Sequence, residues 1–173
     1  MQNIERYDSM SNRVDKTNYY LDIAETVAER STCLRKHYGC IIVKNDEIIS
    51  TGYSGAPRGR ENCIDLGKCT KKEIYPDIRH GGYDACRSVH AEQNAIISAA
   101  RKDMIGSTMY LVGKRNENAE YEKGAMSCQT CRKLIINAGI EKVIVRTPNK
   151  QYVCVDVNEW INNDEILKGK ITY

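Results

Sequence analysis

The sequence is poor in proline, in excess charge of either sign and in long apolar runs. Proline accounts for only 3 of the 173 residues, which disfavours a proline-rich disordered protein. The 26 basic residues against 23 acidic ones leave a net charge of +3. Such a charge neither requires nor excludes a nucleic-acid partner, but a dedicated polybasic binder would carry a much larger excess of basic residues.

Apolar runs such as 40–43 and 95–97 fall far short of the roughly 20 residues that a membrane-spanning helix needs. Residues 1–20 mix charged and polar side chains and contain no apolar core of a secretory signal. We therefore expect a cytoplasmic protein with no membrane association and no stable nucleic-acid partner. In a reducing compartment, the 8 cysteines indicate metal ligation in preference to disulfides.

The apolar content is that of an ordinary folded domain, because 41% of the residues are hydrophobic. A chain of this length predicts one domain, or one domain with an appendage. We expect a flexible N-terminal segment over 1–14, the main domain over 15–150 and a C-terminal extension over 151–173 that packs on the same domain. No internal repeat interrupts this plan.

Apolar periodicity predicts three main helices. Residues 19–30 place Leu21, Ala24 and Ala28 on one helical face. Two further helices are predicted over 89–101 and 128–138, the first from its alanine and isoleucine content and the second from its capping by Gly139.

The strand signals complete an α/β class of fold. A hairpin is predicted to turn at Asn45–Asp46, and buried strands are predicted over 108–112 and 142–146. Because a helix joins the last two strands, they should be parallel with a right-handed crossover. The tail from Tyr152 is expected to add a strand and a short helix.

The sharpest motif is His90-Ala91-Glu92 at the start of one predicted helix, with Cys128-x-x-Cys131 at the start of another. One imidazole and two thiolates form a three-ligand zinc site, which leaves the fourth position open to water. Zinc lowers the pKa of that water from 15.7 to about 7, and Glu92 is positioned to move the proton. Alone, the cysteine pair is also compatible with a redox motif or with half of a structural zinc site.

A histidine-x-glutamate followed by proline-cysteine-x-x-cysteine is typical of zinc deaminases that act on nucleobases. Here Ser127 stands in the place of the proline, and serine is a good helix cap. The ligand chemistry is therefore complete although the motif is not literal.

The segments 31–35, 52–59, 88–96 and 128–140 resemble the cytidine and deoxycytidylate deaminase superfamily, over about residues 19–147. Within it, the sequence is most similar to dCMP deaminases, including late-competence proteins of bacteria. The resemblance implies a three-layer α/β/α domain with a central mixed sheet, one catalytic zinc on His90, Cys128 and Cys131, and Glu92 as proton shuttle. It also implies conversion of dCMP to dUMP for thymidylate synthesis, a hexameric homo-oligomer, and dCTP and dTTP as allosteric effectors.

The predicted substrate contacts lie around this motif. The resemblance suggests that the Ala91 amide binds the pyrimidine carbonyl and that Ser54, where asparagine is usual, holds sugar or base. Arg35 and, less directly, Lys150 are candidates for the phosphate, with a solvated surface arginine as the alternative for Arg35. The segment 114–125 is longer than in the shortest relatives and is expected near the site mouth.

The long segment 54–88 has little apolar content and needs some other source of stability. Four cysteines that the first motif does not use could close a second, structural zinc site there: Cys33, Cys63, Cys69 and Cys86. The alternatives are unligated thiols or a site in which His80 or His37 replaces one cysteine. The remaining two, Cys40 and Cys154, lie in strand-like runs and are expected in the core.

These observations predict a zinc-dependent deaminase, most directly of dCMP. Two other readings stay open: a deaminase of cytidine, guanine or tRNA adenosine, and a non-catalytic, zinc-stabilised accessory protein of competence or DNA uptake. A tRNA substrate would require a basic face. A purely structural zinc site would not need the acid–base carboxylate of Glu92.

Overall fold

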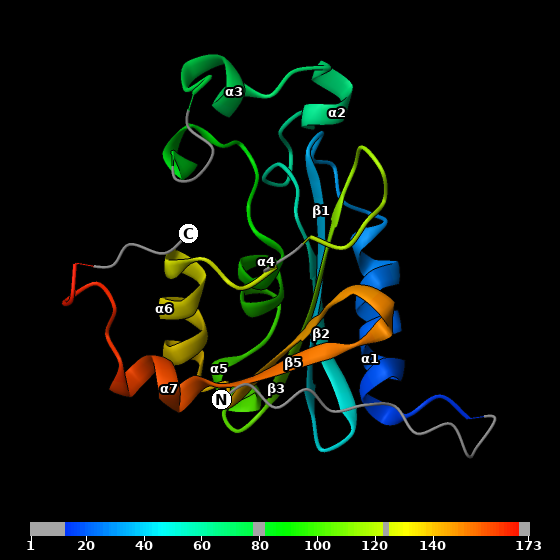
Figure 1. Cartoon of the computed structure of the whole chain (residues 1–173), viewed down its shortest axis with the longest axis vertical. Coiled ribbons are helices and arrows are strands. Elements are labelled where there is room, and N and C mark those ends of the chain that lie inside the picture. The colour runs from blue at the N-terminus through cyan, green and yellow to red at the C-terminus, as the bar shows by residue number, and fades with distance from the viewer. Residues whose placement is uncertain (1–12, 78–81, 123–124, 170–173) are drawn as a thin grey trace.

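The computed structural model describes residues 13–77, 82–122 and 125–169. The segment predicted as flexible, 1–14, lies outside the described residues except for its last two positions. The domain is built on a five-stranded sheet with the order β2-β1-β3-β4-β5 (Figure 1). Its strands are β1 (Lys36–Lys44), β2 (Glu47–Tyr53), β3 (Thr108–Arg115), β4 (Lys142–Arg146) and β5 (Tyr152–Asp156).

The sheet is mixed, as predicted. Strands β3 and β4 are parallel, and the other neighbouring pairs are antiparallel. This arrangement confirms the α/β class and the expectation that a helical crossover joins two parallel strands.

Helices cover both faces of the sheet, which makes three layers (Figure 1). Helix α1 packs on one face, and α4 and α6 lie on the other. The α-helices are α1 (Lys16–Ala28), α2 (Cys63–Leu66), α3 (Thr70–Ile74), α4 (Ala91–Ile97), α5 (Arg101–Met104), α6 (Gln129–Ala138) and α7 (Val157–Asn162). Two short 3₁₀ helices are η1 (Tyr83–Ala85) and η2 (Pro148–Lys150).

The alternation of side chains in β1 divides the core in two. Ile41 and Val43 pack with Leu21 and Ala24 on the α1 side, whereas Cys40 and Ile42 face α4 and α6. Helix α1 approaches β1 closely because Gly39 has no side chain: a Cβ there would collide with the backbone of α1.

The predicted hairpin turn at Asn45–Asp46 joins β1 to β2. Both residues have positive φ, 50° and 70°, which is the requirement of the type I′ turn that suits a two-residue hairpin. The Tyr20 hydroxyl donates to the Asp46 carboxylate and thereby ties α1 to this turn.

Three expectations differ in detail. The helix predicted over 89–101 is two helices, α4 and α5, and the irregular segment 54–88 contains α2, α3 and η1. Cys154, expected in the core, is exposed because β5 is an edge strand. Within the described residues, no helix is long and apolar enough to cross a bilayer.

Candidate active site

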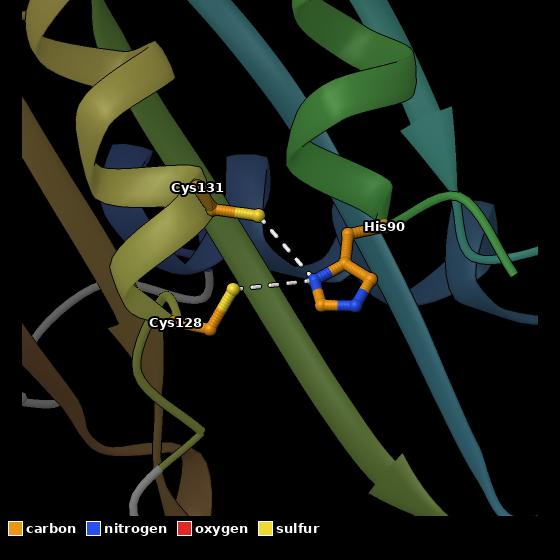
Figure 2. Close-up of side chains that lie close together, drawn as sticks. All are labelled: His90, Cys128 and Cys131. Carbon is orange, nitrogen blue, oxygen red and sulfur yellow. Dashed lines mark hydrogen bonds between the residues drawn. The ribbon is translucent and has the colours of Figure 1, made fainter. Parts of the chain in front are cut away.

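The three predicted metal ligands come together at the beginnings of α4 and α6. His90 immediately precedes α4, Cys128 immediately precedes α6, and Cys131 lies in the first turn of α6. The His90 Nδ1 atom lies 3.5 Å from the Cys128 Sγ and 3.4 Å from the Cys131 Sγ (Figure 2). Both sulfurs and the imidazole point toward one another from the two helices.

These distances suit a tetrahedral metal ion. With metal–ligand bonds of about 2.0–2.3 Å, the edges of a tetrahedron are roughly 3.3–3.8 Å long. The three donor atoms all lie within 4.8 Å of one another, and both cysteines are buried. A nitrogen and two sulfurs form the donor set that zinc prefers, so the residues fit a zinc ion with one position left for another ligand.

Hydrogen bonding between the two cysteines shifts their pKa values in opposite directions. The hydrogen bond from the Cys131 thiol, followed by the one to His90, lowers the pKa of Cys128 to about 4 in spite of burial. The same bond with Cys128, together with burial, raises the pKa of Cys131. The shift favours the thiolate form of Cys128, the form in which cysteine binds a metal, and metal binding at such a site is coupled to proton release.

Glu92 lies two residues after His90 and is only 4% exposed. Its carboxylate is outside the group of mutually close donor atoms, so it is placed beside the metal position without being a fourth ligand. Burial raises the pKa of Glu92. A carboxyl group whose pKa is raised holds a proton more readily and is therefore suited to accept and return one.

Helix α4 is fixed against β2 by a close backbone approach. A Cβ at Gly52 would collide with the backbone of Ala91 and Ala95, so only glycine lets the start of α4 reach the sheet. The Asn94 side chain donates to the Tyr53 carbonyl at 2.7 Å. At the helix start, the His90 backbone N–H donates to the Gln93 side chain at 2.9 Å, which holds the loop that carries the imidazole.

A cleft opens in front of the three donors. His90, Glu92 and Cys128 line it together with three predicted substrate contacts, Arg35, Ser54 and Ala91. The Ser54 hydroxyl is oriented by the backbone N–H of Tyr38, which donates to it at 3.1 Å.

Lys150, predicted as a phosphate contact, does not line this cleft. Its side chain is 68% exposed and lies 3.6 Å from the carboxylate of Asp22, which belongs to α1 on the other face of the sheet. The structure thus places Lys150 beside α1, and a phosphate contact by Lys150 stays a prediction.

The four remaining zinc candidates occupy one region without forming a second ligand group. Cys33, Cys69 and Cys86 line the same cleft, and the pKa of Cys63 is raised by burial and then by these three neighbours. Among the described residues, only the first set of donors meets the spacing of a metal site. Of the two alternative ligands, the His37 ring is hydrogen-bonded to the Cys33 carbonyl at 2.9 Å, and His80 lies outside the described residues.

The cleft also contains residues that were not predicted, among them Tyr38, Lys71 and Tyr83. The Tyr83 ring packs edge-on against the His90 imidazole, with ring centroids 4.9 Å apart. Lys71 is 5% exposed, although lysine is almost never buried without a partner. Its neighbour Lys72 is exposed. Because the two lysines are identical and adjacent in sequence, the sequence alone does not show which of them is buried.

The fold and the site define an α/β protein with a three-donor metal centre and a buried carboxylate beside it, the arrangement of a hydrolytic zinc site. The family model for the cytidine and deoxycytidylate deaminase zinc-binding region matches residues 14–147, and the chain belongs to this family. This confirms the resemblance expected from the motifs.

Named relatives agree with the family. The chain is 34% identical over 134 residues to a deoxycytidylate deaminase of Mycobacterium phage D29, which covers 76% of this chain and 94% of the phage protein. It is 31% identical over 137 residues to a deoxycytidylate deaminase of Schizosaccharomyces pombe, with 75% of this chain but 36% of the yeast protein covered.

A solved structure shares the fold. The dCMP deaminase of cyanophage S-TIM5, crystallised in complex with dCMP and dUMP, superimposes with a TM-score of 0.52 and 26% sequence identity. The match covers 78% of this chain and 85% of the phage chain.

Proposed function

We propose that this chain is a zinc-dependent deaminase that hydrolyses dCMP to dUMP and ammonia, and so supplies dUMP for thymidylate synthesis. The observation that carries the proposal is the meeting of His90, Cys128 and Cys131 beside Glu92, in one cleft. The relatives named deoxycytidylate deaminase support dCMP as the substrate.

Zinc in such a site supplies Lewis-acid activation of water at neutral pH. Glu92 accepts a proton from the attacking water and delivers it to the ring nitrogen, and it then moves a proton to the leaving amine. The Ala91 amide donates to the pyrimidine carbonyl, which orients the ring so that its amino-bearing carbon faces the water. Burial of Glu92 and Ala91 keeps bulk solvent from competing for these protons.

The test is a comparison of ammonia release from dCMP, dCTP, cytidine, guanine and an adenosine-containing tRNA loop. We expect the highest kcat/KM for dCMP. Preference for another of these substrates would identify the chain as a deaminase of that substrate. No turnover of any of them by zinc-loaded protein would favour the non-catalytic accessory protein.

We also propose a second, structural zinc held by Cys33, Cys63, Cys69 and Cys86. Three of these thiols line one cleft, and all three influence the pKa of the fourth, Cys63, which supports a common ion. Elemental analysis of fully loaded protein should give two zinc ions per chain, and Cys69→Ser should lower the value by one. A value of one in the unmodified protein would reject this site.

The proposed cellular setting is a cytoplasmic homo-oligomer, a hexamer by family resemblance, activated by dCTP and inhibited by dTTP. Exposed apolar side chains on the α4–α5 side, such as Ile97 at 76% exposure, support association of copies. Light scattering for the mass and initial rates with each nucleotide test these predictions separately.

A further inference from the structure

Lys71 is a buried cation that faces the cleft. It belongs to α3, is 5% exposed and lines the cleft together with His90 and Glu92. Its Nζ lies over the Tyr83 ring, 4.4 Å from the centroid. Among the ion pairs of the described residues, none involves Lys71. A buried ammonium group without a carboxylate partner is costly to the fold. The groups of the chain that favour its charge are the thiols of Cys86 and Cys69, and an anion bound in the cleft would stabilise it further.

A second cation in the same cleft has the same property. Arg35 lines the cleft and takes part in none of the ion pairs formed within the described part of the chain. Burial lowers the pKa of Lys71, and the charge of Arg35 lowers it further. By contrast, Lys36, next to Arg35, is neutralised by Glu122 at 3.2 Å. Two cations whose charges disfavour one another therefore line the same cleft, and an anion bound there would reduce the repulsion.

The distance to the metal centre suits a nucleotide. Tyr83 contacts Lys71 with its face and the His90 ring with its edge. The Lys71 Nζ is 4.4 Å from the Tyr83 ring centroid, and the His90 ring centroid is 4.9 Å from the same point. The Lys71 ammonium and the His90 ring therefore cannot be farther apart than these two distances together. A nucleoside monophosphate can bridge such a gap, with its base at the metal centre and its phosphate at Lys71.

We propose that Lys71, together with Arg35, binds the 5′-phosphate of the substrate and makes the enzyme selective for nucleotides over nucleosides. The inference rests on the proposed deaminase function and adds to it the group that recognises the phosphate. It also gives the segment 54–88 a direct role at the active site, because α3 carries Lys71 into the cleft between Cys69 and Cys86.

The test compares Lys71→Met with Lys72→Met, which makes the same change at the exposed neighbouring position. Loss of a hydrogen-bonded charge pair should raise KM for dCMP roughly 10- to 100-fold in Lys71→Met. Its kcat should change much less, because the phosphate contact stabilises substrate and transition state alike. In Lys71→Met, activity on deoxycytidine should fall much less than activity on dCMP, whereas Lys72→Met should change neither. Lys71→Arg should keep part of the preference for dCMP.

Binding of the product dUMP, measured by calorimetry, gives a readout that does not depend on turnover. Lys71→Met should lose affinity for dUMP but not for deoxyuridine, while its melting temperature reports whether it is folded. Suppose that the wild-type enzyme deaminates dCMP and that the Lys71→Met and Lys72→Met variants behave alike. The phosphate site is then rejected and the deaminase function stands. If the wild-type protein does not deaminate dCMP but Lys71→Met alone loses dUMP binding, the phosphate site stands and the proposed function is rejected.

Discussion

Replacing Glu92 by glutamine removes the proton acceptor from the site and leaves its shape unchanged. Glu92 is 4% exposed, and its carboxylate lies outside the donor group of His90, Cys128 and Cys131, so the variant should still hold zinc. General acid–base catalysis contributes about 10²- to 10⁴-fold to a rate, equivalent to roughly 3–5.5 kcal/mol of barrier. We expect kcat for dCMP to fall by at least this range, because Glu92 is the only carboxylate among the described residues that line the cleft.

The assay follows dUMP formation by chromatography and zinc content by elemental analysis on the same samples. The matched control is Glu25→Gln, because Glu25 is a partly buried carboxylate on the opposite face of the sheet, hydrogen-bonded to Tyr121 at 2.8 Å. It should leave kcat unchanged. A Glu92→Gln variant with full zinc content and full activity would refute the assigned role of Glu92.

Cys131→Ser should lose one zinc per chain together with nearly all activity, because a hydroxyl replaces a thiolate ligand, whereas Cys154→Ser, at an exposed position, should lose neither. Gly52→Ala should lower the free energy of unfolding by about 1–3 kcal/mol in urea titrations, since its Cβ must displace the backbone of α4; an unchanged value would contradict the close approach. The hydrogen bond to Asp46 raises the pKa of Tyr20 from 10.0 to about 12. Its stabilising contribution should therefore be complete below pH 10 and disappear as the pH rises to about 12, a loss that Tyr20→Phe should not show in matched unfolding curves.

Local sequence signals predicted those elements whose structure depends on near neighbours. The turn at Asn45–Asp46 is one example, because both residue types tolerate positive φ and both adopt it. The helix predicted over 89–101 is the counterexample. Alanine favours a continuous helix there, but the Ser98 hydroxyl donates to the Asn94 carbonyl at 2.8 Å where α4 ends. The start of α5 is held by the contact of Arg101 with the end of α6, 2.8 Å from the Asn137 carbonyl, which a local pattern does not reveal.

The metal centre was predictable because each ligand type has a fixed place at a helix start, and two such starts on one face of a sheet bring the ligands together. The cations of the cleft were harder to predict. Arg35 was recognised through its place in a motif, whereas Lys71 and Lys72 are chemically identical neighbours in a segment without periodicity. Only the packing of α3 makes one buried and the other exposed. For the same reason, the position of Lys150 after a strand did not reveal that its side chain lies near Asp22 of α1.

The most direct test of the account is the fate of solvent oxygen. Zinc-loaded protein incubated with dCMP in water enriched in ¹⁸O should release ammonia and form dUMP with one ¹⁸O atom at the carbon that carried the amino group, detected by mass spectrometry. Absence of labelled dUMP under conditions where the protein is folded and holds zinc at His90, Cys128 and Cys131 would contradict hydrolytic deamination at this site.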